Sequence, residues 1–295
     1  MTDATARSAA RPIRPRARWT SIGVLATAAL LAWAAVTIEI RIGRLAELPG
    51  ALAFIFTRMF LERGPEWAYL PQAFGAMLQS LQIAWLGTLI GAVLSLPLGF
   101  VAAQNVSGRL GSNAVRQLLN AVRAVPEILL AVVVFIPIVG IGGTAGAYAG
   151  TLAIGIHSIG TLGKLTAEVV EGIDPGPVEA ARATGAGPLQ VQRWGVLPQV
   201  LPDVIAFWLY RFEINVRASA VLGVLGAGGI GTVLVDALAF RRFDRAGIAI
   251  IVIIVVTVLI DAASGWLRRR IIEGGAVRPG RAELEQPELR EVAAG

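Results

Sequence analysis

Long apolar stretches recur along this chain, and they decide what it can fold into. Six of them are separated by more polar segments, at residues 19–38, 75–103, 118–139, 147–162, 201–225 and 247–267. A helix of about 20 apolar residues is long enough to cross the roughly 30 Å hydrocarbon core of a bilayer. The pattern therefore predicts one all-α membrane protein with about six transmembrane helices in the lipid bilayer, rather than one or two soluble domains.

Composition and charge narrow the function. Charged residues make up 16% of the chain, against about 25% in soluble proteins, and hydrophobic residues make up 55%. The net charge of +6 comes from arginines before, between and after the apolar stretches. That distribution is typical of cytoplasmic loops rather than of a nucleic-acid site. With no cysteine and one histidine, the chain lacks thiol nucleophiles and multi-His or Cys metal sites. We therefore expect no catalytic residues, no metal and no nucleic-acid partner.

The sequence divides into four parts. They are a basic cytoplasmic arm at 1–18, a first transmembrane helix with an external segment at 19–73, a main transmembrane domain at 74–268 and a cytoplasmic tail at 269–295. The external segment is expected to contain a short interfacial helix over 52–60. The tail is charged, contains proline and has no apolar periodicity, which is typical of disorder.

Basic residues predict the orientation in the membrane. Arginines before the first stretch, and Arg268–Arg270 after the last one, place both termini in the cytoplasm. Arg241, Arg242 and Arg245 conflict with this topology, because the number of spans puts their loop outside. A cleaved signal peptide is the alternative for the first stretch, but that stretch exceeds the apolar run of about 7–15 residues in such peptides.

A polar insertion at about 173–200 follows the fourth stretch, so the number of spans places it in the cytoplasm. Asp174 is suited to cap a helix that starts at Pro175, because proline lacks the N–H that would be unpaired there. Gly185 is placed to end that helix in a left-handed turn. A second helix is expected from Pro188 to Pro198. The insertion is thus predicted to form two short helices outside the bilayer.

The insertion carries Glu-Ala-Ala, a glycine four residues later and Leu-Pro near its end. This spacing resembles the EAA loop of bacterial ABC-importer permeases, through which the membrane subunit docks on its ATPase. Small alanines allow close approach to a partner, and Glu179 and Arg182 lie at i and i+3 to fix its orientation. An ordinary cytoplasmic loop is the alternative. The resemblance assigns ATPase coupling to Glu179, Ala180, Ala181, Arg182, Gly185, Leu197 and Pro198.

Further segments resemble the permease subunit of phosphonate ABC importers, the PhnE family. They are RAVPE at 123–127, HSIGTLGKL at 157–165, IDPGPVEAARATGAG at 173–187 and RFEINVRASAVLGVLGAGGIG at 211–231. The resemblance implies import of an organophosphonate or related phosphorus oxyanion across the bacterial cytoplasmic membrane. It also implies paired permeases, a pair of ATPases that hold ATP and Mg²⁺, an extracytoplasmic phosphonate-binding protein and no cofactor in this chain. Because one chain supplies one docking loop and the ATPases come as a pair, we expect the permease to be a homodimer.

Other functions remain open at this point. The same machine can carry phosphite, phosphate or methionine, because the binding protein largely chooses the cargo. A membrane enzyme is an alternative from a different class, but the sequence offers no plausible nucleophile and base, or metal ligands, for it. A non-transport membrane scaffold is another, and it would need no partner ATPase.

Polar residues inside the apolar stretches are the candidates for the substrate pathway. An ionisable group in a bilayer costs several kcal/mol unless it is paired or faces water. In the fifth stretch, Glu213 and Arg217 lie one turn apart, as do Arg211 and Asn215, on nearly opposite faces. One pair could lock helices together while the other lines a cavity, where arginine attracts an anion. A buried structural ion pair is the alternative. The candidates are Arg123, Glu127, His157, Ser158, Arg211, Glu213, Asn215 and Arg217.

The segment 226–231 matches G-x-G-x-x-G, the pattern of dinucleotide-binding loops. It ends an apolar helix and no β-α-β unit surrounds it, so the match does not indicate a nucleotide site. Closely spaced glycines in a membrane protein favour tight contact between helices or a re-entrant turn. We assign this role to Gly226, Gly228, Gly229 and Gly231. The energy for transport is then expected to come from another subunit.

Overall fold

The computed structural model describes residues 17–37, 46–141 and 143–275. The chain divides into two compact units, Met1–Phe56 and Thr57–Gly295. Every regular element in the described ranges is helical, which confirms the all-α prediction. Most of the basic arm and of the tail, residues 1–16 and 276–295, lies outside the described residues.

The described residues of the first unit form the helices α1 (Ala17–Thr37) and α3 (Leu48–Phe56). Residues Thr20–Thr37 of α1 are long and apolar enough to cross a membrane, and none of them is buried by the protein. The helix expected over 52–60 is present but starts earlier, as α3, and its last part is a separate π-helical turn, Thr57–Leu61.

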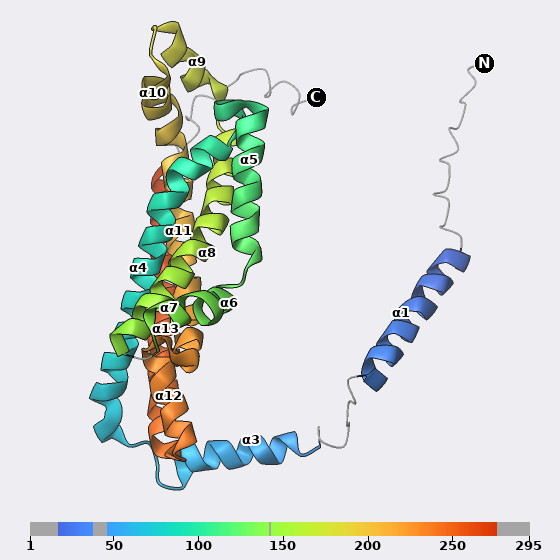
Figure 1. Ribbon diagram of the computed structural model, residues 1–295, viewed down its shortest axis with the longest axis vertical. Coiled ribbons are helices and arrows are strands. Elements are labelled where there is room, and N and C mark those ends of the chain that lie inside the picture. The colour runs from blue at the N-terminus through green and yellow to red at the C-terminus, as the bar shows by residue number, and fades with distance from the viewer. Residues whose placement is uncertain (1–16, 38–45, 142, 276–295) are drawn as a thin grey trace, which may run out of the picture. The chain divides into compact units, whose positions relative to one another are not determined.

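The second unit is a bundle of helices (Figure 1). In chain order they are α4 (Leu70–Ala102), α5 (Gln104–Ala124), α6 (Glu127–Leu129), α7 (Ile136–Val139), α8 (Gly143–Glu171), α9 (Pro175–Ala183), α10 (Pro188–Val191), α11 (Leu197–Leu222), α12 (Ile230–Ala239) and α13 (Phe243–Gly275). Short π-helical stretches, Leu130–Phe135, Gln192–Val196 and Gly223–Ala227, join several of them. Because α13 continues to Gly275, the first residues assigned to the tail are helical.

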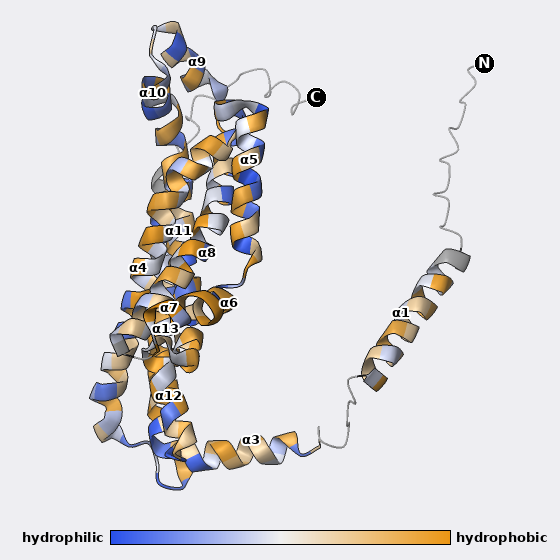
Figure 2. Ribbon diagram, viewed as in Figure 1, coloured by the Kyte–Doolittle hydropathy of each residue, from blue (hydrophilic) through white to orange (hydrophobic). Residues whose placement is uncertain are grey.

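Helices α4, α8 and α11 pack against one another at the centre of this unit. A Cβ atom on Gly91 of α4 would lie 2.4 Å from the Cβ of Ser158 in α8, so only glycine permits this approach. Close contacts through small residues are typical of helix packing in membranes. Figure 2 shows apolar residues along these helices and hydrophilic residues in α9 and α10.

Fewer than six described helices are long and apolar enough to cross a membrane. Three described segments qualify as single helices, Thr20–Thr37, Trp67–Ala102 and Phe243–Ile272, and two bent helix pairs raise the number to five. Helix α8, which contains the fourth predicted stretch, is not among them. Six spans therefore remain a prediction.

The third predicted stretch, 118–139, is not one straight helix. Its helical segments Gln104–Ala124 and Glu127–Val139 meet at an angle of 74°. Val125 is extended, with φ −88° and ψ 116°, because a residue before proline avoids the α conformation. Pro126 also lacks the N–H that a continuous helix would use. The predicted third stretch is therefore part of a bent pair of helices, which together meet the length and composition test for one span.

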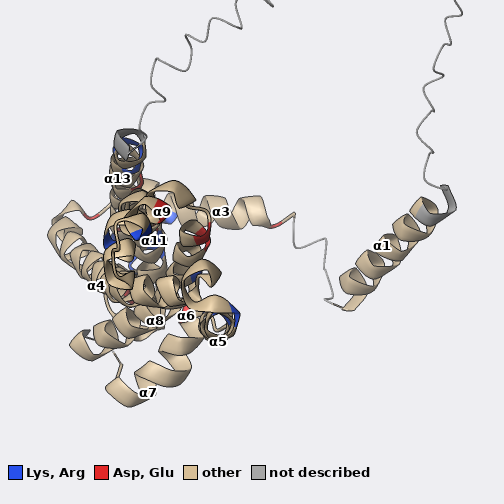
Figure 3. Ribbon diagram, turned by 90° about the horizontal axis from the view of Figure 1, so that it is seen from above, with Lys and Arg blue, Asp and Glu red and all other residues tan. Residues whose placement is uncertain are grey.

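An ion pair ties the segment before α4 to the first turn of α13, at the end of the bundle away from α9 and α10 (Figure 1). Nε of Arg245 lies 2.6 Å from Oε2 of Glu66, and its guanidinium stacks over the ring of Tyr69. Glu66 thus neutralises one of the three arginines that conflict with the predicted topology. Seen from above, other basic residues lie on α5 and α13 (Figure 3).

Candidate functional site

The polar insertion folds as two short helices, α9 and α10, beyond one end of the bundle (Figure 1). The N–H of Gly176 donates a hydrogen bond of 2.9 Å to Oδ1 of Asp174, which caps α9, and Pro175 is the first residue of that helix. Gly185 follows α9 with φ +77°, in the left-handed region that favours glycine. The predicted cap, turn and helix start are therefore confirmed.

Gln199 fastens this loop to α11. Its Nε2 donates to the carbonyl oxygens of Gly195 (2.6 Å) and Asp174 (3.2 Å), and its Oε1 accepts from the N–H of Asp174 (3.1 Å). A Cβ on Gly195 would lie 3.1 Å from Cα of Val178, so α9 packs directly on the π-helical stretch Gln192–Val196 that leads into α11. Sequence reasoning missed Gln199, because a single glutamine carries no recognisable signal.

The second helix of the insertion does not stop at Pro198 as expected. Its π-helical end joins α11, which begins at Leu197 with Pro198 in its first turn. Proline is tolerated there because the first N–H groups of a helix have no partner within it. The insertion therefore leads without a break into a long helix of the bundle.

The loop exposes the residues that a partner could contact. Glu179, Ala180, Arg182, Gly185 and Pro198 are exposed, whereas Ala181 and Leu197 are half-buried. Two large apolar side chains are also exposed, Leu189 at 85% and Trp194 at 68%. Leu189 lies in α10 and Trp194 in the π-helical stretch that follows it. The sequence prediction did not assign these two side chains to docking, although both lie inside the insertion.

Glu171, the last residue of α8, joins the base of the loop to the turn between α4 and α5. Its carboxylate pairs with Arg116 and accepts a 2.7 Å hydrogen bond from the N–H of Gln104. Nε of Arg116 also donates to the carbonyl of Ala102 at 2.8 Å. Burial raises the pKa of Glu171. The hydrogen bonds from Gln104 and Arg116 and the charge of Arg116 together outweigh this effect, so the pKa lies below the ordinary value of 4.5.

The depressed pKa of Glu171 predicts a pH-dependent contribution to stability. The contribution is full above the unfolded value of 4.5 and is lost as pH falls through the lower folded pKa. We expect Glu171→Gln to lower the melting temperature of the detergent-solubilised protein at pH 7, by a difference that shrinks below about pH 4.5. Glu168→Gln is the control, since Glu168 makes one longer pair, 3.5 Å to Lys164. A difference that stays constant with pH would contradict the prediction.

The candidates Arg211, Asn215 and Ser158 meet in a buried polar cluster between α8, α11 and α4. Nε of Arg211 donates to Oγ of Ser158 at 3.1 Å, and Nδ2 of Asn215 donates to the same oxygen at 3.1 Å and to Oγ1 of Thr88 at 2.8 Å. Arg211 is 7% exposed and Asn215 is fully buried. Nη2 of Arg211 and Oδ1 of Asn215 have no partner among the described residues. Thr88 was not predicted, because one threonine in an apolar run carries no signal.

Glu213 and Arg217 form the second predicted pair, and it points elsewhere. Their side chains are 3.3 Å apart, and Arg217 also lies 3.1 Å from Oδ2 of Asp261 in α13. This group ties α11 to α13, so the two pairs do have different environments. Asp261 was missed, although an acidic residue inside the sixth stretch should have been included on the same argument.

The remaining candidates lie around the break between α5 and α6. Nε2 of His157 is 3.5 Å from Oε2 of Glu127, and Nδ1 of His157 is 3.0 Å from the carbonyl of Val125. Arg123 and Glu127 do not lie one helical turn apart, because the extended Val125 interrupts the helix between them. Glu127 faces His157 of α8 instead.

The glycine-rich segment bends the chain between α11 and α12, and the helical segments on its two sides meet at 53°. Gly226, Gly228 and Gly229 have φ values of +97°, +81° and +75°. A Cβ on Gly231 would lie 2.1 Å from the carbonyl oxygen of Ala220, so this position has no room for a side chain. The N–H of Gly229 donates to Oε1 of Gln79 at 3.0 Å. These glycines therefore form a tight bend with close backbone contact, and a re-entrant turn stays a prediction.

Comparison with known proteins places the chain in a family. Residues 95–273 match the family described as binding-protein-dependent transport system inner membrane component. The phosphate-import permease protein PhnE of Mycolicibacterium smegmatis is 44% identical over 200 residues, 68% of this chain and 37% of that protein. The phosphite transport system permease protein PtxC of Stutzerimonas stutzeri is 43% identical over 194 residues, 65% of this chain and 69% of that protein. The matched region thus spans little more than a third of the mycobacterial protein.

A further relative and a solved structure are also transport-system permeases or chains of an ABC transporter. The putative phosphite transport system permease protein HtxC of Stutzerimonas stutzeri is 35% identical over 256 residues, 86% of each chain. A chain of the MetNI methionine ABC transporter, in an inward-facing conformation, has a TM-score of 0.55 and 24% identity over 67% of this chain and 95% of that chain. At that identity the likeness concerns the fold. Since the family match covers more than half of the chain, this protein belongs to the inner-membrane components of binding-protein-dependent transport systems.

Proposed function

We propose that this chain is the permease subunit of an ABC importer that moves a phosphonate, or a related phosphorus oxyanion, across the bacterial cytoplasmic membrane. The loop of α9 and α10 carries the proposal. It projects beyond the bundle, exposes Leu189 and Trp194, and is fastened to α11 through Gln199. The names of PhnE, PtxC and HtxC, which refer to phosphate and phosphite, support a phosphorus oxyanion as cargo.

The proposed assembly contains two copies of this permease, two ATPases and an extracytoplasmic binding protein. ATP and Mg²⁺ are held by the ATPases, and this chain contributes no catalytic residue. Both termini and the α9–α10 loop lie in the cytoplasm. When the ATPases close on ATP, they pull on α9, and the contacts of Gln199 and Gly195 transmit that movement to α11. The helices then rock between an outward and an inward opening.

Arg211 and Asn215 are the proposed contacts for the anion in this pathway. A guanidinium matches the geometry of a phosphorus oxyanion and binds it through charge-assisted hydrogen bonds. Nη2 of Arg211 is buried without a partner among the described residues, so it has a donor to offer. Because the cluster is buried, the cargo reaches it only after α8 and α11 separate. A purely structural role for the cluster is the competing explanation.

An assay of cargo-stimulated ATP hydrolysis tests which cargo the importer carries. The permease is reconstituted in liposomes with its ATPase and binding protein, and ATP hydrolysis is measured with methylphosphonate, phosphite, phosphate or methionine. We expect stimulation by one or more of the phosphorus oxyanions, by about tenfold, and none by methionine. Stimulation by methionine alone would agree with an ABC importer but contradict a phosphorus oxyanion as its cargo. A permease that associates with no ATPase would overturn the importer and favour a membrane scaffold.

A further inference from the structure

Polar residues run along two adjacent helices, α5 and α8, which pack against each other. On α5, Asn113, Gln117, Asn120 and Arg123 follow one another at spacings of three or four residues, and on α8 so do His157, Thr161, Lys164 and Glu168. Residues at such spacings share one face of a helix. All of these side chains are exposed or half-buried. Both helices therefore present a polar stripe on an accessible surface.

This surface is not suited to face lipid tails. A charged side chain against hydrocarbon costs several kcal/mol, and such groups in membrane proteins almost always face a water-filled cavity or another protein surface. With a rise of 1.5 Å per residue, Lys164 lies about 10 Å and His157 about 20 Å along α8 from its end at Glu171. The fourth predicted stretch ends at residue 162, so His157 and Thr161 lie inside it and Lys164 lies just beyond its end. A water-filled pathway along α5 and α8 accounts for the polar stripe.

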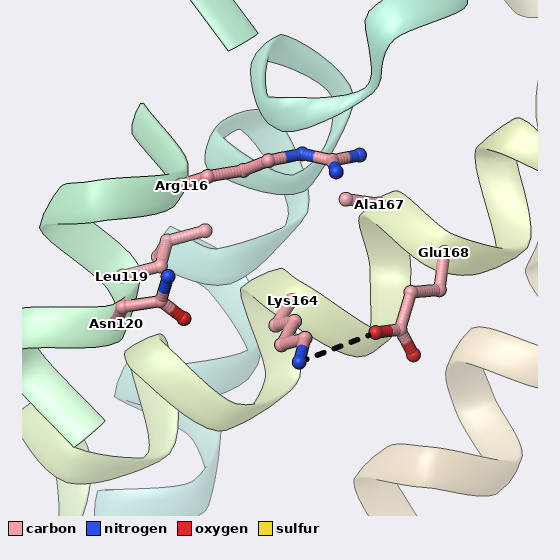
Figure 4. A pocket seen from close by; sticks show the side chains of 6 residues that line it. All are labelled: Arg116, Leu119, Asn120, Lys164, Ala167 and Glu168. Carbon is pink, nitrogen blue, oxygen red and sulfur yellow. Dashed lines mark ion pairs between the residues drawn. The ribbon is translucent and has the colours of Figure 1, made fainter. Parts of the chain in front are cut away.

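A cavity of about 210 Å³ opens on this surface between the two helices (Figure 4). Its lining consists of Arg116, Leu119 and Asn120 from α5 and of Lys164, Ala167 and Glu168 from α8. Leu119 and Ala167 are buried and close its floor. The volume is below the range of about 300–1,000 Å³ for sites that hold drug-sized ligands. A small ion is the appropriate occupant.

The polar groups of the cavity differ in how firmly they are held. Arg116 is fixed by Glu171 and by the carbonyl of Ala102. Lys164 has only a 3.5 Å pair with Glu168, and both side chains are about half exposed, 42% and 55%. Exposed pairs of this kind contribute about 1 kcal/mol or less. The amide of Asn120 has no hydrogen-bond partner among the described residues. Lys164 and Asn120 can therefore turn to a ligand at little cost.

We infer that this cavity is a release site for the phosphorus oxyanion, in which Lys164 exchanges Glu168 for the cargo and Asn120 donates a hydrogen bond to it. The inference rests on the proposed function and adds a second site to it, nearer the α9–α10 loop than Arg211. Lysine binds phosphate-like groups as a point charge. The neighbouring carboxylate of Glu168 repels the anion and keeps its binding weak. A transport pathway needs such weakness, since the cargo has to leave.

The absence of cysteine from the chain permits a direct test. Lys164→Cys is assembled with the ATPase and the binding protein in liposomes, and methylphosphonate uptake is measured. We expect uptake to fall by about tenfold, which corresponds to about 1.4 kcal/mol. An aminoethyl methanethiosulfonate, which restores an ammonium group, is expected to recover uptake. The sulfonatoethyl reagent, which adds a negative charge, is expected to lower it further, and excess methylphosphonate should slow both labelling reactions.

Two further single-cysteine variants extend the test of the release site. Asn120→Cys should be labelled and protected by methylphosphonate in the same way. Leu259→Cys on α13, where the leucine is 62% exposed among apolar neighbours, should resist both reagents, because lipid covers it. A Lys164→Cys variant that is not labelled, or that responds equally to both reagents, would overturn the release site while normal wild-type uptake leaves the importer intact. A wild-type complex that takes up no phosphorus oxyanion would overturn both proposals.

Discussion

Gly185→Asp is expected to abolish cargo-stimulated ATP hydrolysis, with a loss of about tenfold or more, while the permease itself stays folded. Among the described residues, no atom beyond its two chain neighbours lies within 4 Å of a Cβ placed on Gly185. The only internal cost is the left-handed backbone, with φ +77°, which amounts to about 1–2 kcal/mol for a residue with a side chain. A larger loss of function must therefore come from a partner that meets the new carboxylate.

Gly64→Asp is a matched control for this variant. Gly64 has φ +71° and equally open space around its Cβ, but it lies in the loop before α4, away from α9 and α10 (Figure 1). Both variants should show a similar small decrease in melting temperature. Only Gly185→Asp should lose co-purification with the ATPase, or lose stimulation within an intact complex. Equal losses of stimulation in the two variants would remove the assignment of this loop to ATPase docking.

The α9–α10 loop could be predicted because its determinants are local. Asp174, Pro175 and Gly185 each act on the backbone within a few residues, through a cap, a missing N–H and a left-handed turn. The separation of Glu213 and Arg217 from Arg211 and Asn215 was predictable for the same reason, since helical periodicity fixes it. These features need no knowledge of how the helices pack.

Contacts between distant segments could not be predicted in this way. Asn215 donates to Thr88, which is 127 residues away, and no pattern in either stretch connects them. The glycines at the contact of α4 and α8, such as Gly91, acquire meaning only once Ser158 is seen opposite. The break before Pro126 is different, because the residue pair signalled it. Counting apolar residues as one continuous span concealed that signal.

Arg211→Gln is expected to reduce methylphosphonate uptake by about tenfold or more while the permease still assembles with its ATPase. Each strong charge-assisted contact with an oxyanion contributes about 1.5–3 kcal/mol, so the loss of one explains an effect of this size. Glutamine keeps a donor that can reach Oγ of Ser158 and thus preserves part of the buried cluster. Uptake and the cargo concentration for half-maximal stimulation are measured together with the melting temperature.

Arg217→Gln serves as the matched control, because it removes an equal charge from the same helix. Arg217 bridges Glu213 and Asp261, so its loss should lower the melting temperature with little change in cargo dependence. Arg211→Gln should do the reverse, and Arg211→Lys should recover part of the uptake because it restores the charge without the forked geometry. If Arg211→Gln lowers only the melting temperature, and folded complexes transport normally, the cluster is structural. The cargo pathway would then follow α5 and α8 without passing through Arg211.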